Sequence, residues 1–225
     1  NYDQGNSVGS ATAGTGNTIR NFGGSVTGHG IRAANQNAFI ASNNTINNTA
    51  GGGVDATAAL YGVFLESGTN VTATVNANTI TLSQGAVSTA LQGVNDATSG
   101  TGTITIGASG AGNTIALTSN SGTASGSSTT GCAGIVNSGS NATLSVGYNA
   151  FTFTSAATSA AYSVVYNSTA VASGNTFTVT NNTFLNAANT VASTGTLSFF
   201  YGSLADAGPL NITNNQFSLN RTGSS

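Results

Sequence analysis

Short runs of alternating apolar and small polar residues recur along the whole chain. In "NTITL" at 78–82, the Asn, Ile and Leu side chains fall on one side of an extended chain and the two Thr on the other. The runs are rich in Thr, Val, Ile and Phe and are bounded by Gly, Asn and Ser. This pattern predicts β-strands rather than helices, whose apolar period is near 3.6.

Three such runs recur in a fixed order, and we name them the A, B and C strands. The predicted A strands are 30–33, 61–65, 90–94, 132–136, 162–166 and 197–201. The predicted B strands are 38–42, 70–75, 103–106, 142–146, 169–173 and 209–213. Each C strand opens with Asn, any residue, then Ile or Phe, at Asn17, Asn44, Asn78, Asn113, Asn149, Asn175 and Asn215. The gaps between these Asn are 27, 34, 35, 36, 26 and 40 residues, an imperfect period that is typical of a repeat architecture.

A three-strand coil that repeats in this way predicts an all-β, parallel β-solenoid of about six coils, stacked at about 4.8 Å. Equivalent positions then form columns, so the Asn side chains stack as a ladder at the start of the C strands. An amide carries donors and an acceptor, and it can therefore satisfy polar groups at a buried corner. A β-sandwich also uses short strands, but it does not repeat this three-part order.

The motif Asn-Thr-Phe occurs twice within a few residues, at 175–177 and at 182–184. We assign the first copy to a C strand. We assign the second copy, within the 180–196 insert, to a loop or a short extra strand between C and A. Repeat proteins concentrate insertions at one bend, and the C-to-A connection is the most variable one here.

The segment "NVTATVNANTITL" at 70–82 is an alternating strand followed by Asn-Thr-Ile. It resembles the coils of bacterial right-handed parallel β-helix proteins, particularly large repetitive cell-surface proteins of the adhesin type. The resemblance covers nearly the whole chain and implies right-handed coils, in agreement with the usual crossover rule. We expect one domain over 1–225, as a segment or subunit of a longer fibre, because neither end of the sequence shows a helical or charged cap. That fold includes adhesins as well as polysaccharide lyases and hydrolases, so it does not decide the function.

Composition narrows the function, because only 4% of the residues are charged. Three Arg, no Lys and a net charge of −2 disfavour nucleic acid as a partner. No apolar run approaches the ~18 residues of a membrane-spanning helix. The chain contains no Met, so residue 1 is not expected to be a translation start. An uncharged rod with few tryptic sites indicates an extracellular or cell-surface location.

Candidate chemistry is sparse. Cys132 and His29 lie far apart in the sequence, and we expect Cys132 to be a small buried apolar residue. Glu66 and Asp96 both follow an A strand in consecutive coils, and they are the weak candidate pair for glycan cleavage. Solvated turn acids are the favoured interpretation of both. No residue spacing suits a metal ion, and we expect no cofactor.

The A strands "YGVFL", "YSVVY" and "LSFFY" carry large apolar residues on both faces. Strands of this kind are usually covered on both sides. We expect Phe64, Val165 and Phe200 to point outward as a candidate assembly face. Its cover is either the long C-to-A connections or a neighbouring molecule.

The sequence therefore predicts a structural or adhesive β-solenoid without catalysis. Its expected partners are copies of itself or adjoining repeats of a longer chain, with surface glycans as a further candidate. A secreted carbohydrate-binding or carbohydrate-cleaving protein is the alternative. Ice binding is a second alternative, since outward C-strand positions carry many Thr, with Thr176 and Thr178 counted among them. Arg20, Asn47, Ala150 and Gln216 interrupt that array.

Overall fold

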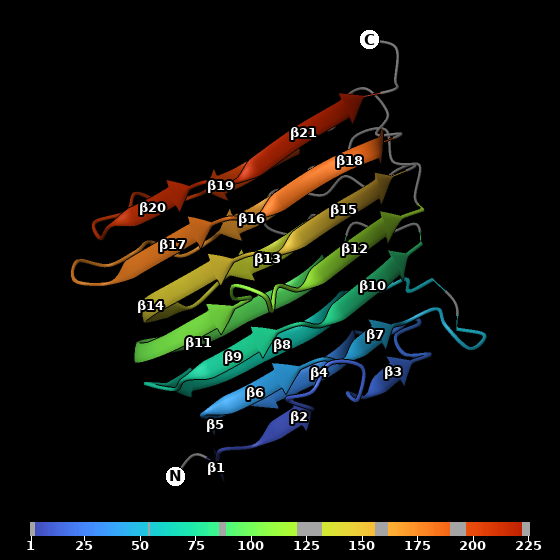
Figure 1. The fold of residues 1–225 in the computed structure, drawn as a ribbon, viewed down its shortest axis with the longest axis horizontal. Coiled ribbons are helices and arrows are strands. Elements are labelled where there is room, and N and C mark those ends of the chain that lie inside the picture. Colours follow the sequence, from blue (N-terminus) through green and yellow to red (C-terminus); the bar gives the residue numbers. More distant parts are fainter. Residues whose placement is uncertain are drawn as a thin grey trace.

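The computed structural model describes residues 3–53, 55–85, 89–120, 132–155, 162–189 and 197–221, and the regular elements in these ranges are β-strands. Successive coils lie one above another, and their strands pair in parallel (Figure 1). The first and the last described strands of the chain lie at opposite ends of the stack. This arrangement confirms the predicted all-β, parallel β-solenoid.

Each coil supplies strands to three positions, in the predicted order. The A strands are β4 (Gly28–Ala34), β8 (Leu60–Thr69), the first half of β11 (Leu91–Ile106), β13 (Cys132–Asn137), β16 (Tyr162–Asn167) and β19 (Leu197–Gly202). The B strands are β2 (Ser7–Gly9), β6 (Phe39–Ser42), β9 (Ala73–Asn76), the second half of β11, β14 (Ser140–Gly147), β17 (Thr176–Thr180) and β20 (Leu210–Thr213). The C strands are β3 (Thr18–Arg20), β7 (Thr45–Asn47), β10 (Thr79–Gln84), β12 (Thr114–Ser119), β15 (Ala150–Ser155), β18 (Thr183–Asn189) and β21 (Gln216–Arg221). At the N-terminal end, β1 (Asp3–Gln4) also pairs with β5 (Gln36–Asn37).

The C strands form one seven-stranded sheet, whereas the A and B strands share a twelve-stranded sheet. The A and B positions are joined because β11 passes through both: its first half pairs with β8 and β13, and its second half with β9 and β14. Equivalent residues meet in successive coils, as Ile80 does with Ile46 on one side and Ile115 on the other. Side chains at one position of the repeat therefore stack along the axis.

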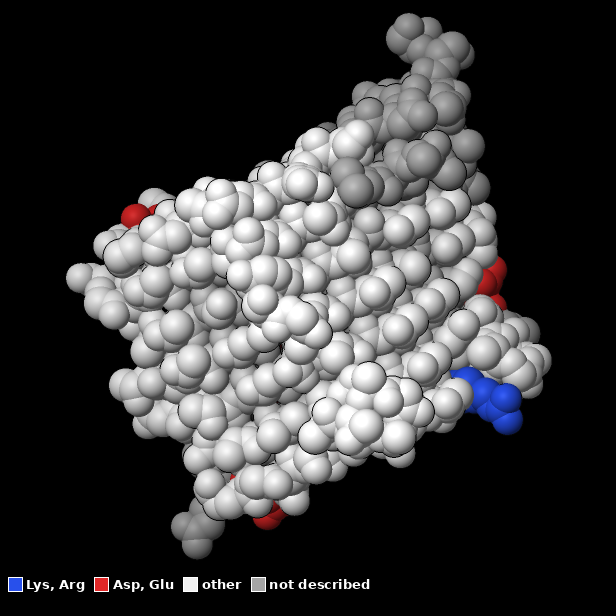
Figure 2. All heavy atoms as spheres, in the orientation of Figure 1, with Lys and Arg blue, Asp and Glu red and all other residues white. Residues whose placement is uncertain are grey.

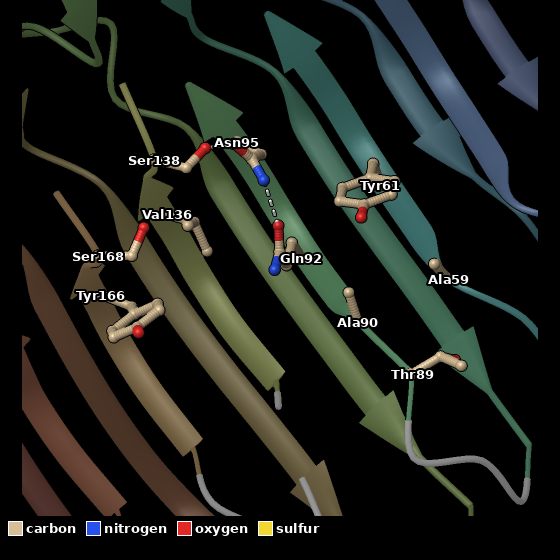
Figure 3. Close-up of a pocket in the computed structure, with 10 residues that line it drawn as sticks. All are labelled: Ala59, Tyr61, Thr89, Ala90, Gln92, Asn95, Val136, Ser138, Tyr166 and Ser168. Carbon is tan, nitrogen blue, oxygen red and sulfur yellow. Dashed lines mark hydrogen bonds between the residues drawn. The ribbon is translucent and has the colours of Figure 1, made fainter. Parts of the chain in front are cut away.

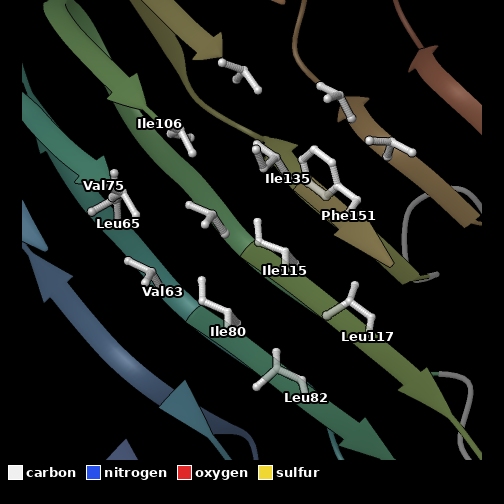
Figure 4. Packing of buried hydrophobic residues seen from close by; sticks show 14 of the residues in the cluster. Val63, Leu65, Val75, Ile80, Leu82, Ile106, Ile115, Leu117, Ile135 and Phe151 are labelled. Carbon is white, nitrogen blue, oxygen red and sulfur yellow. The ribbon is translucent and has the colours of Figure 1, made fainter. Parts of the chain in front are cut away.

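Columns of aliphatic and aromatic side chains fill the interior (Figure 4). One C-strand column contains Ile80, Ile115 and Phe151, and the next contains Leu82 and Leu117. Toward the C-terminal end the columns become aromatic, and the ring centroids of Phe153 and Phe184 lie 5.3 Å apart. Burial of each large apolar side chain contributes about 1.5–3 kcal/mol, so these columns are the main source of cohesion between coils.

The A strands depart from strict alternation at one glycine. Leu60, Val63 and Leu65 lie in the core, whereas Tyr61 and Phe64 stack against each other outside it. The outward positions are therefore three residues apart instead of two. The shift occurs because two consecutive residues, Gly62 and Val63, are both buried.

This glycine position passes close to the C strands. A Cβ atom on Gly62 would lie 2.5 Å from Cγ2 of Ile80, and one on Gly93 would lie 2.5 Å from Cγ2 of Ile115. Neither distance is compatible with a side chain, so glycine is required for the close approach of the two strands. The same close approach occurs at Gly30 and Gly134, whereas Val164 and Phe199 occupy this position in the last two A strands.

A ladder of Asn side chains fills the corner between the B and C strands. Asn78 donates its backbone N–H and its Nδ2 group to Oδ1 of Asn113, each at 3.0 Å. Its Nδ2 group also donates to the backbone oxygen of Ala41 at 2.9 Å, and its Oδ1 accepts the same pair of bonds from Asn44. Every polar atom of the amide is paired at a corner where Asn78 is 1% exposed.

The structure corrects one member of the predicted ladder, because Asn182 takes the place of Asn175. The ladder runs through Asn17, Asn44, Asn78, Asn113, Asn149, Asn182 and Asn215. Asn175 instead precedes β17, which pairs with β14 and β20 and is therefore a B strand. The second Asn-Thr-Phe motif begins the C strand β18, and the predicted B strand at 169–173 is a connection.

The reason is spacing, because a ladder amide bonds only to amides one coil away. Asn182 is 33 residues from Asn149 and 33 residues from Asn215. Residues 190–196 of the predicted insert lie outside the described residues.

Several corner residues that precede a ladder Asn adopt a left-handed backbone. Asn43, Asn181 and Asn214 do so with φ of 58°, 54° and 54°. Asn tolerates this conformation better than most residues that carry a side chain. The Asn-Asn doublets of the sequence therefore combine a turn residue with a ladder residue.

Candidate functional site

The outer face of the A strands presents two columns of side chains, three residues apart. The first column contains His29, Tyr61, Gln92, Ala133, Ser163 and Ser198. The second contains Arg32, Phe64, Asn95, Val136, Tyr166 and Tyr201. Aromatic and amide groups thus gather on a face that is separate from the core.

Two of the three residues predicted for an assembly face do not belong to this surface. Phe64 faces outward, but Val165 and Phe200 align with the inward column that contains Val63. Val165 is fully buried in the core. The prediction counted strict alternation, whereas two consecutive residues pack against the core, Val164 with Val165 and Phe199 with Phe200. The outward partners of Phe64 are Tyr166 and Tyr201.

A groove of ≈ 490 Å³ lies over four consecutive A strands, β8, β11, β13 and β16. Its volume is within the range of small-ligand sites. The Tyr61 ring stands on one side and the Tyr166 ring on the other, with Gln92 and Asn95 between them (Figure 3). The residues that line the groove are all uncharged.

A chain of hydrogen bonds fixes the amides of the groove. Ser138 Oγ donates to Asn95 Oδ1 at 2.8 Å, and Asn95 Nδ2 donates to Gln92 Oε1 at 2.7 Å. Gln92 and Asn95 are only 5% and 7% exposed, so water competes weakly for these bonds. The Gln92 Nε2 group lies at the end of the chain, on the side away from Asn95.

Tyr166 adds a second polar group without a partner. Its hydroxyl is buried and makes no hydrogen bond within the described ranges. Its ring packs with Ala133 and Val136 in a small apolar cluster that is separate from the main core. A buried hydroxyl without a partner costs about 1–3 kcal/mol, so a polar group that reached it would regain a hydrogen bond.

An aromatic stack extends the face toward the N-terminal end. The rings of His29, Tyr61 and Phe64 lie nearly parallel, with centroids 5.0–5.4 Å apart. Beside them, Arg32 forms an ion pair with Glu66, and this hydrogen bond lowers the pKa of Glu66. Burial lowers the pKa of His29, with a further contribution from Arg32 that Glu66 opposes. At neutral pH the stack is therefore uncharged, and the neighbouring charges neutralise each other.

The candidate carboxylates Glu66 and Asp96 are not brought together on one surface. Glu66 is partly exposed and bound to Arg32, whereas Asp96 is fully buried at the corner between A and B. Asp96 Oδ1 accepts hydrogen bonds from the backbone N–H and the hydroxyl of Thr98, and Oδ2 accepts one from Asn141 at 2.6 Å. Neither carboxylate lines the groove. The interpretation as a solvated turn acid is wrong for Asp96.

Asp96 belongs to a second column of polar side chains, which the sequence analysis missed. It aligns with Asn137 and Asn167, and Asn137 Nδ2 donates to Asn167 Oδ1 at 2.7 Å. Burial raises the pKa of Asp96 to about 6, although the hydrogen bonds from Thr98 and Asn141 act in the opposite direction. The available signal was an Asp or Asn that closes successive A strands.

Cys132 is a core residue, as the sequence predicts. It is buried in the interior column between Leu91 and Tyr162. Burial raises the pKa of its thiol to about 12, while a hydrogen bond with Tyr162 acts in the opposite direction. His29 lies on the outer face, so the two residues do not form a catalytic pair.

The threonines considered for ice contact form columns on two strand positions. The first outward C-strand column reads Thr18, Thr45, Thr79, Thr114, Ala150, Thr183 and Gln216. Thr176 and Thr178 are B-strand residues instead, and they align with Thr143 and Ser145. In the view of Figure 2, charged side chains appear only at the margins of the molecule.

Among the residues that the structure describes, no group of three or more His, Cys, Asp or Glu is placed to hold a metal ion. The same part of the chain contains no helix that is long and apolar enough to cross a membrane.

The fold and the Asn ladder define the class of molecule as a β-solenoid of stacked parallel coils. No family model matches the chain, and comparison with curated proteins and with solved structures gives no match. The resemblance to bacterial surface proteins therefore rests on the coil pattern alone. The function has to be argued from the residues themselves.

Sequence reasoning missed the groove residues Gln92, Asn95 and Tyr166. A signal for them exists, since "YGVF" at 61–64 and "QGVN" at 92–95 share one pattern, with the outward residues at its first and last positions. The sequence alone does not show this spacing of three. It becomes visible only when the two middle residues of each pattern are seen to be buried.

Proposed function

We propose that the protein is a non-catalytic structural and adhesive β-solenoid that forms, or belongs to, an extracellular surface fibre. The observation that carries this proposal is the continuity of the stack, because the described coils pair in parallel and equivalent core residues align from one coil to the next. The columns of Val179 and Phe184 continue into the last described coil at Ile212 and Phe217. Repeats that bury their apolar columns only against neighbouring repeats are the basis of extended rods.

The ladder supports the same role. The amide column passes through all the C-strand corners, so each coil is hydrogen-bonded to the next by side chains as well as by backbone. Coils bonded in this way form a rod. Such a rod lengthens when a further coil with an Asn at the same corner stacks on it. The small number of charges in the chain favours an extracellular setting.

Electron microscopy of the native protein tests the proposal. We expect fibres with an axial repeat of ~4.8 Å. The variant Ile212→Asp places a charge in the end-to-end joint and should shorten the fibres to discrete particles. The matched control is Ile40→Asp, because Ile40 is similarly exposed, at 44%, on the outer side of β6.

The two variants separate the modes of assembly. Loss of fibres in Ile212→Asp alone supports end-to-end stacking, and loss in Ile40→Asp alone supports lateral contacts. Short particles for the native protein at all concentrations would overturn self-assembly as its function.

Ice binding is a second candidate, favoured by the hydroxyl columns on the B and C strands. The variant Thr114→Tyr places a large ring in the middle of the C-strand column, whereas Thr101→Tyr alters an exposed residue of β11 that lies outside it. If ice is the ligand, thermal hysteresis of the native protein should be lost only in the first variant. No thermal hysteresis in the native protein would rule this candidate out.

A further inference from the structure

We propose that the groove on the A strands binds a short, neutral oligosaccharide. This inference rests on the proposed adhesive function and names the ligand class of that function. The observations that carry it are two tyrosine rings on opposite sides of the groove, fixed amides between them, and polar groups without partners.

The charge of the groove selects a neutral ligand. Its lining residues are all uncharged, and the nearby Arg32 and Glu66 neutralise each other. An anionic or cationic ligand would lose its hydration here without gaining a counter-charge. Sugar hydroxyls need only hydrogen bonds, which amides and hydroxyl groups supply.

The polar groups are ordered before a ligand arrives. The bonds from Ser138 to Asn95 and from Asn95 to Gln92 set the orientation of both amides. The Gln92 Nε2 group then remains for a ligand, since it bonds to no other described residue. Binding to such a site needs little side-chain ordering, and this lowers its entropic cost.

The aromatic rings set the shape of the ligand. Tyr61 and Tyr166 lie on β8 and β16, which are three strand spacings apart, or about 14 Å. This distance suits an extended oligosaccharide better than a single sugar. One side of Tyr61 stacks with His29, and its neighbour in register on the other side is Gln92. A sugar ring can therefore lie against Tyr61 and reach Gln92 at the same time.

The test is titration of the folded protein with a panel of trisaccharides, followed by calorimetry. The neutral probes are cellotriose, maltotriose, mannotriose and tri-N-acetylchitotriose, and the anionic probe is trigalacturonic acid. Gln92→Glu keeps the acceptor for Asn95 and removes the free donor, so it should weaken binding about tenfold. Tyr61→Leu should weaken binding about fivefold through loss of the ring contact.

The matched controls lie outside the groove. Gln216→Glu changes an exposed glutamine of β21, and Tyr148→Leu changes an exposed tyrosine at the corner between B and C. Both should leave the dissociation constant within about twofold of the native value. Circular dichroism of each variant confirms that its fold is kept.

The outcomes are distinct from those of the assembly test. Binding of a neutral probe that is weakened only by the groove variants supports the inference. The inference is overturned if no neutral probe binds at about 10 mM, if trigalacturonic acid binds best, or if the groove variants bind normally. Fibres without saccharide binding would overturn this ligand and leave the structural role. Saccharide binding without fibres would support this ligand and overturn self-assembly.

Discussion

Asn175 and Asn182 begin identical Asn-Thr-Phe motifs but occupy different environments. Asn182 is fully buried, accepts two hydrogen bonds from Asn149 and donates to the backbone oxygen of Val146. Asn175 is half-buried in a turn. At the scale of the residue, stability therefore depends on whether an amide lies in the ladder.

The first prediction compares these two residues. Asn182→Ala should lower the free energy of unfolding by at least about 3 kcal/mol, because each buried group left without a partner costs about 1–3 kcal/mol. Asn175→Ala should lower it by less than about 1 kcal/mol. Urea unfolding followed by circular dichroism measures both, and equal effects would show that the ladder is not the source of stability.

The second prediction concerns Asp96. Its pKa is about 6 in the folded protein, above the ordinary value of 3.8, so folding favours its protonated form. The stability from this group is complete below pH 4 and is lost as the pH rises through 6, by up to about 3 kcal/mol. Asp96→Asn should remove this dependence and unfold at a higher temperature than the native protein at pH 7.5. The prediction is contradicted if the unfolding temperature of the native protein does not decrease when the pH is raised from 4.5 to 7.5.

At the scale of the element, the glycine position of the A strands controls the distance between A and C. The interruption of alternation at Gly62 places Val63 inside and Phe64 outside, and it thereby creates the outer face that carries the groove. Glycine occupies this position in four coils, at 30, 62, 93 and 134, whereas Val164 and Phe199 occupy it in the last two.

The third prediction tests that control. Gly93→Ala introduces a Cβ 2.5 Å from Cγ2 of Ile115 on the C strand and 2.5 Å from the backbone oxygen of Gly134, and it should destabilise the protein by about 1–3 kcal/mol. Gly85→Ala is the control, because its Cβ would make only an ordinary contact at 3.6 Å. Denaturant unfolding of both variants measures the difference. A similar midpoint for the two would mean that the A and C strands can move apart at no cost.

At the scale of the whole molecule, cohesion comes from stacked columns and not from charge. Within the part of the chain that the structure describes, the ion pair between Arg32 and Glu66 is the only one, and the Arg32 side chain is 55% exposed. Exposed pairs of this kind contribute little to stability, because water and salt screen the two charges.

The fourth prediction follows from the small contribution of charge to the cohesion of the stack. Raising NaCl from about 20 mM to about 500 mM should shift the unfolding temperature by less than about 4 °C, since screening acts on little more than one exposed pair. Differential scanning calorimetry at both salt concentrations checks this. A larger fall would indicate that charges contribute more to the stack than the described contacts imply.

Strand type and order were predictable because each coil repeats the same local rules. A ladder Asn, an alternating run and a small-residue bend recur, so errors in one coil are limited by the others. The error at Asn175 arose where two identical motifs competed, and local sequence cannot decide between them. The choice depends on which Asn lies within reach of Asn149 and Asn215, and that is a contact between coils.

The groove residues were harder to predict for a related reason. Gln92 and Asn95 lie on β11, whereas Tyr61 and Tyr166 come from other coils, so the groove exists only after stacking. The outward direction of Tyr166 also depends on Val164 and Val165 both lying in the core, which shifts the alternation by one residue.

By itself, the sequence determined the class of fold, the three strands of each coil and the polar, weakly charged surface, because these follow from periodicity and composition. Only the tertiary structure decided which Asn enters the ladder, which face each A-strand residue takes, and that Asp96 is buried. These features depend on contacts between residues about one coil apart, and such contacts form only when the coils stack.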